Sequence, residues 1–252
     1  MDIQKSLKNR IKFLLGFLGF RYSVIPRESW GICPWQDINR ILKDQSFKVN
    51  KAAIQTIFDI GANEGQCAQW MRQFYSSKAV KIYSFEPSSQ AYSVLKAKSA
   101  VLDIIPVNIA LSSKVEERTL YEYSGSVLNS LNPVTPVSNA NNALKETLVS
   151  CDTVDNFCYK SGIQSIDILK IDTESFDLEV LKGSSQMLAE GKVRFIYFEF
   201  FNVNKYFTDA PGNFQELTKF LEAYPFRPIT FYTDYVNPLH PVSHFNCLFA
   251  RW

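Results

Sequence analysis

From Ala53 onward, short apolar runs alternate with longer amphipathic stretches. The runs are brief and rich in β-branched and aromatic residues, which favours strands, whereas the amphipathic stretches favour helices. Strands that are apolar throughout and separated by helices predict a parallel sheet covered on both faces, an α/β fold. We predict strands at 56–60, 80–85, 103–107, 166–171, 193–200, 228–232 and 245–252, and helices at 36–43, 64–75, 88–100, 176–188 and 214–224.

The first 50 residues follow a different pattern, and we expect them to form a helical appendage to a main domain of residues 51–252. Apolar residues recur every three or four positions between Ile3 and Leu18, which predicts an amphipathic helix. Residues 1–27 carry six basic side chains and one acidic side chain. The apolar run 13–20 is shorter than the ~20 residues that span a bilayer, and no secretory cleavage site follows it. Such a helix either lies on an anionic membrane surface, with residues 1–20 as the contact, or packs against the main domain or a second subunit.

The composition excludes several classes of protein. With 252 residues, 46% hydrophobic residues and a formal net charge of +2, the chain is neither disordered nor built mainly to bind nucleic acid. Five cysteines without a C-x-x-C pair, and only two histidines, argue against a disulfide framework or a zinc site. We therefore expect a cytoplasmic protein, peripheral to the inner membrane face if the first helix binds lipid.

A glycine motif follows the first predicted strand, with Asp59, Gly61, Asn63 and Gly65 in sequence. Gly61 lets the chain turn and lets a ligand approach the backbone, while the next helix directs free N–H groups toward that ligand. Asp59 can accept a hydrogen bond from a cationic amine. The spacing G-x-x-x-G differs from the dinucleotide pattern G-x-G-x-x-G, which argues against a nicotinamide cofactor. Taken alone, the motif is equally consistent with a tight turn capped by Asn63.

Two further strand ends carry polar residues that suit a nucleoside. Glu86 follows the second predicted strand, where an acid can accept hydrogen bonds from both hydroxyls of a ribose. Asn108 interrupts an apolar run after the third strand, where a purine base would lie. Because ligands in parallel sheets bind beyond the carboxyl ends of the strands, the three segments are expected to form one site.

The chain carries, in order, D-I-G-A-N-E-G, F-E-P-S-S-Q-A, N-I-A-L-S, I-D-I-L-K-I-D-T-E-S and V-L-K-G. This series resembles the FkbM family of S-adenosylmethionine-dependent methyltransferases over about residues 53–200. The resemblance implies a Rossmann-like class I methyltransferase fold, with a mostly parallel seven-stranded sheet and an antiparallel last strand. It also implies O-methylation, often of sugar or polyketide hydroxyls. The cofactor residues that it implies are Asp59, Gly61, Asn63 and Gly65 along the methionine part, Glu86 at the ribose and Asn108 near the adenine.

Three acidic residues close the fourth and fifth predicted strands and are candidates for catalysis: Asp172, Glu174 and Glu199. A hydroxyl acceptor must lose a proton, and a nearby carboxylate can take it. His240 and His244 are weaker candidates for the same task. The three acids could instead hold a divalent ion such as Mg²⁺, although a metal is not expected.

The sequence departs from the family pattern E-G-x-E, because Glu174 is followed by Ser175, Phe176 and Asp177. Losing the glycine is costly if the backbone there needs a positive φ. Capping of the next helix explains Ser175 and Asp177, but it does not explain Asp172 or Glu199.

Two loops are candidates for binding the acceptor. Residues 124–143 are rich in Ser, Asn and Pro, and form either a lid or acceptor-binding insertion, or a connector or dimer contact. Residues 200–212 combine aromatic rings with Asn202 and Asn204, which suits a sugar. The sequence thus predicts an S-adenosylmethionine-dependent O-methyltransferase acting on a saccharide or related metabolite. The alternative is a nucleoside-binding recognition or scaffold module without turnover.

Overall fold

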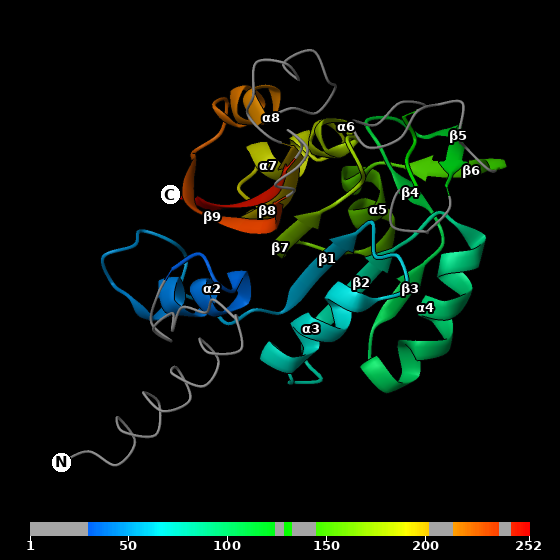
Figure 1. Cartoon of the computed structure of the whole chain (residues 1–252). Coiled ribbons are helices and arrows are strands. Elements are labelled where there is room, and N and C mark those ends of the chain that lie inside the picture. Colours follow the sequence, from blue (N-terminus) through cyan, green and yellow to red (C-terminus); the bar gives the residue numbers. More distant parts are fainter. Residues whose placement is uncertain (1–29, 124–128, 133–144, 202–213, 237–242) are drawn as a thin grey trace, which may run out of the picture.

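A computed structural model describes residues 30–123, 129–132, 145–201, 214–236 and 243–252 (Figure 1). Within them a seven-stranded sheet has the order β3-β2-β1-β7-β8-β10-β9. All of its neighbouring pairs are parallel except those of β10, which runs antiparallel to β8 and β9. This confirms the expected mostly parallel sheet with an antiparallel last strand. Its strands are β1 Thr56–Ile60, β2 Lys81–Phe85, β3 Ile105–Val107, β7 Ile166–Ile171, β8 Val193–Phe201, β9 Phe226–Val236 and β10 Ser243–Arg251.

Helices cover both faces of this sheet (Figure 1). Successive residues of a strand point to opposite faces, so an apolar strand packs against helices on both sides. On β1, Ile57 packs with one hydrophobic cluster and Phe58 with the other. The Ile57 side holds α2 Pro34–Lys43, α3 Gln66–Phe74 and α4 Ser89–Leu102. The Phe58 side holds α5 Val154–Ser161, α6 Asp177–Lys182, α7 Ser185–Ala189 and α8 Phe214–Leu221.

The described part of the N-terminal segment packs into the same core as the sheet. Trp35, Ile38 and Ile41 of α2 are fully buried. The ring of Trp35 lies 5.7 Å from that of Trp70 on α3 and 5.4 Å from that of Tyr197 on β8. The amphipathic helix expected near the N-terminus lies outside the described residues. Among the helices that the structure does describe, none is long and apolar enough to cross a membrane.

A second sheet, with the order β4-β6-β5, was not predicted from the sequence. Its strands are β4 Ala110–Leu111, β5 Glu116–Glu122 and β6 Lys145–Asp152. β5 and β6 are antiparallel neighbours in sequence, from the pair Glu116 with Cys151 to the pair Glu122 with Lys145. Ser130, from the connection between them, bridges back to Tyr121. The polar stretch expected to be a long loop therefore belongs in part to a hairpin.

The prediction of one helix at 176–188 was wrong, because α6 and α7 are separate. Gly183 lies between them, and a Cβ atom there would stand 2.0 Å from the carbonyl oxygen of Ser112. The second helix then begins anew, with Asp155 accepting hydrogen bonds from the backbone N–H groups of Gln186 and Met187. Close contact with a neighbouring loop, which periodicity cannot reveal, interrupts the helix.

Candidate active site

A cavity of about 430 Å³ opens at the carboxyl ends of β1, β2 and β7. The strand order reverses between β1 and β7, which is where ligands bind in sheets of this type. Of the sequence-predicted site residues, six line the cavity: Gly61, Asn63, Glu86, Asp172, Glu174 and Glu199. Asp59, Gly65 and Asn108 are not among its lining residues.

The glycine motif shapes the floor of the cavity. Gly61 has a φ of +72°, and a Cβ atom there would stand 1.8 Å from the carbonyl oxygen of Asp172. The backbone N–H groups of Gly61 and Ala62 both donate to the carbonyl of Phe85, which fixes the turn against β2. Gly65, at the start of α3, also has a positive φ, of +88°. A Cβ atom there would stand 2.9 Å from Cδ1 of Leu95 on α4. Gly61 thus lets two strand ends meet at the cavity, whereas Gly65 lets α3 pack against α4.

Glu86 places a buried carboxylate in the cavity wall. Its side chain is 6% exposed; Oε2 accepts from the N–H of Asn63 at 2.9 Å and Oε1 accepts from the N–H of Ser88 at 2.8 Å. Burial raises the pKa of Glu86 to about 7, although these two hydrogen bonds oppose the rise. Asn108 donates to the carbonyls of Glu86 and Pro87, so it fastens this strand end.

Lys170 is a site residue that the sequence analysis missed. Its Nζ lies 2.9 Å from Oδ1 of the fully buried Asp59 and 3.3 Å from Oδ2 of Asp172. It also donates to the carbonyls of Ile60 and Gly61. Burial alone lowers the pKa of Lys170, but the attraction of Asp59 and Asp172 outweighs it and holds the pKa well above the usual range. The partner of Asp59 is therefore this lysine, a residue that lines the cavity.

A signal for Lys170 was present in the sequence. The residue stands inside an apolar strand, and a charge that is buried on a covered sheet needs a partner. Asp59 and Asp172, at the ends of the two neighbouring strands, are the acidic partners that a buried lysine needs.

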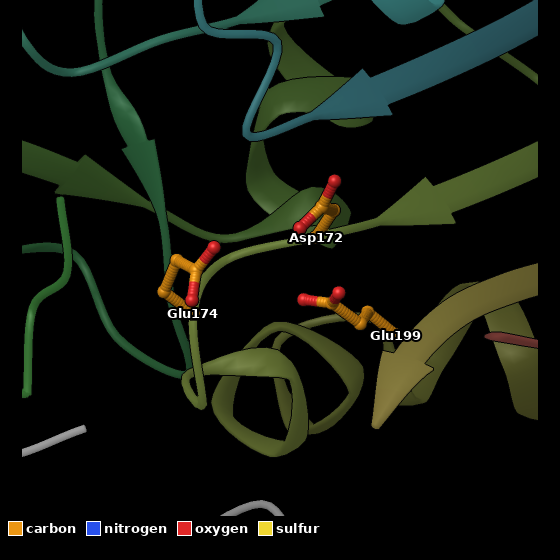
Figure 2. A group of neighbouring side chains, drawn as sticks. All are labelled: Asp172, Glu174 and Glu199. Atoms are coloured by element: carbon orange, nitrogen blue, oxygen red, sulfur yellow. The ribbon is translucent and has the colours of Figure 1, made fainter. Parts of the chain in front are cut away.

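Three carboxylates face one another across the end of the cavity (Figure 2). Asp172 and Glu174 follow β7, and Glu199 comes from β8. One carboxylate oxygen from each lies within 4.8 Å of the others. Burial, together with repulsion from Glu199 and Asp172, raises the pKa of Glu174 to about 10. We call these three residues the carboxylate cluster.

Asp177 lies behind the carboxylate cluster at the start of α6. It is 2% exposed, and its Oδ2 accepts a hydrogen bond from the hydroxyl of Thr173 at 3.1 Å. Burial, and then the charges of Asp172 and Glu199, raise its pKa to about 8. A fourth acid therefore interacts with the same group.

The chain reaches the cluster through a strained turn. Glu174 and Ser175 have φ values of +52° and +74°, a left-handed conformation that favours glycine. Ser130 donates its hydroxyl to the carbonyl of Glu174, and Asn132 donates its side-chain amide to the carbonyl of Ser175, both at 2.7 Å. The hairpin connection therefore holds the turn in place. The backbone at Ser175 does need the positive φ that the family's glycine would adopt readily.

Part of each candidate loop lies outside the described residues. Of the stretch 124–143, residues 129–132 are described, and Asn129, Ser130 and Leu131 line the cavity. Residues 202–212 and His240 lie outside the described part of the chain, as does the side chain of His244.

Comparison with known proteins identifies the family. The profile described as the methyltransferase FkbM domain matches residues 59–228, more than half of the chain. The chain belongs to the FkbM methyltransferase family. It is also 24% identical, over 169 residues, to the 2-O-methyltransferase NoeI of Sinorhizobium fredii, a match covering 62% of this chain and 67% of that protein.

A solved structure shares the fold of this FkbM methyltransferase. The FkbM methyltransferase of Methylobacillus flagellatus KT superposes with a TM-score of 0.50 and 13% identity, covering 78% of this chain and 43% of that one. An O-methyltransferase of Bacillus cereus, in complex with S-adenosylhomocysteine, gives a TM-score of 0.47 and 11% identity over 98% of this chain and 90% of that one. At such identities the first match supports a Rossmann-like methyltransferase fold and nothing finer. The chain spans less than half of the Methylobacillus protein.

Proposed function

We propose that this methyltransferase uses S-adenosylmethionine to methylate a hydroxyl of a saccharide or a related metabolite. The observation that carries the proposal is the buried Glu86 in the wall of a cavity at the switch in strand order. The similarity to a 2-O-methyltransferase supports oxygen as the atom that is methylated.

The residues of the cavity suit this cofactor. A volume of about 430 Å³ falls within the ~300–1,000 Å³ of small-molecule sites. A carboxylate can accept about four hydrogen bonds, and Glu86 accepts two from backbone N–H groups of the chain, so it retains capacity for two ribose hydroxyls. Gly61 and Asn63 would line the methionine part and Ile109 the adenine end. Asp59 would act by holding Lys170, and Asn108 by holding the backbone of Glu86.

When bound, S-adenosylmethionine supplies an electrophilic methyl group on a positively charged sulfur. The chain orients the acceptor and receives the proton of its hydroxyl. Asp172, Glu174 and Glu199 line the cavity and are the candidates for that base. Carboxylates are strong hydrogen-bond acceptors, which suits an acceptor with several hydroxyls. Correct orientation of the acceptor is the main contribution expected of the protein.

We infer a cytoplasmic enzyme that acts on a small-molecule or glycan acceptor and not on nucleic acid. The basic segment 1–20 would contact the inner membrane face, and a homodimer is compatible with the same segment packing against a second subunit.

A thermal-shift titration tests the cofactor assignment. S-adenosylhomocysteine should raise the melting temperature and NAD should not, because a ligand that binds only the folded state stabilises it. Glu86→Ala should abolish the shift. Glu64→Gln is the matched control, since Glu64 follows Asn63 in the loop that contacts Glu86 but pairs with Lys98 and does not line the cavity. An unchanged melting temperature of the wild-type chain with S-adenosylhomocysteine would refute the proposal.

The acceptor is tested by methyl transfer to a panel of free and lipid-linked saccharides. Transfer to a hydroxyl, lost in Asp172→Asn, is the expected result. Binding of S-adenosylhomocysteine without transfer to any member of the panel would favour a recognition module over a saccharide methyltransferase.

A further inference from the structure

We propose that the carboxylate cluster of Asp172, Glu174 and Glu199 holds a hard divalent cation, such as Mg²⁺ or Mn²⁺, at the end of the cavity (Figure 2). The site deepens the proposed function, because an ion there would face the acceptor. The ion site itself does not depend on which acceptor the enzyme uses.

The geometry of the cluster suits oxygen ligation. Ligands on opposite sides of Mg²⁺ stand ~4.2 Å apart, since each bond is ~2.0–2.1 Å, and around Ca²⁺ the separation is ~5 Å. One oxygen from each of Asp172, Glu174 and Glu199 lies within 4.8 Å of the other two. Small side-chain rotations would therefore bring all three into the coordination sphere of one ion. Their origin on two strand ends leaves the cavity side open for water or an acceptor oxygen.

A buried oxygen behind the cluster provides an independent indication of a missing partner. Asp177 is 2% exposed, and its Oδ1 has no hydrogen-bond partner among the described residues. Its carboxylate interacts electrostatically with Asp172 and Glu199, so it is close to the cluster. Oε2 of Glu174 is likewise buried and without a hydrogen bond from any described group. A buried acceptor left unpaired costs ~1–3 kcal/mol, so a structure retains several together only where something else offsets them.

Lys170 brings one positive charge to the carboxylate cluster. Its Nζ lies 3.3 Å from Oδ2 of Asp172. The same ammonium lies closer to Asp59, at 2.9 Å, so one positive charge serves two carboxylates. Glu174, Asp177 and Glu199 add further carboxyl groups in contact with the same region. A bound dication would add positive charge to a region where several carboxyl groups meet.

The ion would also assist the chemistry that the site is proposed to perform. A hard cation lowers the pKa of a water or hydroxyl group whose oxygen it binds. An acceptor hydroxyl held between the ion and the cavity would therefore lose its proton to a nearby carboxylate more readily than a free hydroxyl would.

Mn²⁺ titration of the full-length chain tests the site without cofactor or acceptor. After treatment with EDTA and its removal, the paramagnetic resonance signal of free Mn²⁺ should fall to a plateau at one ion per chain. Mg²⁺ or Ca²⁺ should restore the signal by competition, and the stronger competitor indicates the preferred ion. An undiminished Mn²⁺ signal at millimolar concentration would overturn the proposal.

Variants locate the ion. Asp172→Asn and Glu199→Gln should each weaken Mn²⁺ binding at least tenfold, whereas Glu179→Gln, an acid on α6 that pairs with Lys182, should leave it unchanged. Because Glu199→Gln removes a carboxylate that repels Glu174 and Asp177, the metal-free melting temperature of this variant should equal or exceed that of the wild type. If Glu199→Gln does not fold, the half-exposed Asp172 still provides the test. Full binding in both cluster variants would place the ion elsewhere and overturn the proposal.

The outcome is separable from the cofactor assignment. A chain that binds S-adenosylhomocysteine but not Mn²⁺ retains the proposed function and loses the metal. A chain that binds Mn²⁺ in the cluster but not S-adenosylhomocysteine retains the metal and loses the cofactor assignment.

Discussion

At the scale of single residues, Ser175 combines two unfavourable features. Its φ of +74° is left-handed, which costs ~1–2 kcal/mol for a residue with a Cβ atom. Its side chain is 4% exposed, and its Oγ has no hydrogen-bond partner among the described residues. The strain lies beside the carboxylate cluster, where an altered backbone would displace Glu174.

Ser175→Gly should stabilise the protein by about 1 kcal/mol. The variant relieves the left-handed strain and removes a buried hydroxyl, and these gains exceed the ~0.5–1 kcal/mol of extra chain entropy that glycine loses on folding. Ser175→Ala is the matched control, because it removes the hydroxyl and keeps the strain. Urea denaturation should rank the glycine variant above the alanine variant; equal midpoints would show that φ carries no cost here.

Glu86 should make cofactor binding depend on pH. Its pKa of about 7 reflects burial, and ribose hydroxyls donate to the ionised carboxylate. Affinity for S-adenosylhomocysteine should therefore be about tenfold weaker at pH 6 than at pH 8, because each pH unit below the pKa leaves a tenth of the ionised form. Calorimetry at each pH measures this, and Glu86→Gln should bind weakly with no such slope. A flat wild-type curve would contradict the assignment.

The same raised pKa has a consequence for stability. Relative to the ordinary value of 4.5, the folded state of Glu86 holds its proton longer than the unfolded chain does. Glu86 therefore lowers the free energy of unfolding as the pH rises from about 4.5 to about 7, and this contribution is constant above that range.

Residues at strand ends were the most predictable part of the site. Glu86, Asp172 and Glu199 were expected at the edge of the sheet, and each lines the cavity, because a polar residue that closes an apolar strand has few other places to go. Lys170 was missed because it stands within the strand. The proximity of Ser130 to Glu174 could not be foreseen, since it joins residues 44 positions apart through a hairpin with no clear periodicity.

At the scale of elements, the β5–β6 hairpin connects the small sheet to the active site. Its strands were not predicted, because β5 and β6 carry charged residues at several positions and lack a clean apolar alternation. The connection between them nevertheless holds the turn after β7 through Ser130 and Asn132. The large sheet was predictable because its strands are apolar on both faces.

Asn132→Ala should loosen the turn that presents Glu174. Loss of its hydrogen bond to the carbonyl of Ser175 should cost about 1 kcal/mol. Hydrogen exchange of the amides at 173–177 should accelerate in this variant. Asn129→Ala is the matched control, because the hydrogen bond that it removes, from the N–H of Tyr123, lies inside the hairpin. Equal exchange in both variants would show that the hairpin does not hold the turn.

At the scale of the whole molecule, residues on both sides of the domain boundary expected near residue 50 pack in one hydrophobic cluster. Arg194 on β8 donates to the carbonyls of Asn50 and Ala52 and pairs with Asp167 on β7 at 2.7 Å. Asp167 in turn accepts from the backbone N–H of Thr56. The segment before β1 is therefore fastened to the middle of the sheet.

The four tryptophans make this attachment measurable. All four contact the layer formed by the N-terminal segment. Trp35 meets Trp70 edge to face, and the ring of Phe47 contacts those of Trp30 and Trp252. Tryptophan fluorescence thus reports on that layer, while far-UV circular dichroism reports on the whole fold. If the segment and the sheet form one unit, the two probes should give the same urea midpoint.

Arg194→Leu should lower both midpoints together, by roughly 3 kcal/mol in the free energy of unfolding, because it leaves Asp167 without its charge partner. Arg194→Lys keeps the charge but loses the forked hydrogen bonds, so its effect should be smaller. A fluorescence midpoint that falls while the circular dichroism midpoint stays would instead show that residues 30–50 unfold separately from the methyltransferase domain. If the fluorescence and circular dichroism midpoints coincide in the wild type and in both Arg194 variants, a truncation at residue 50 would remove part of the enzyme's own core.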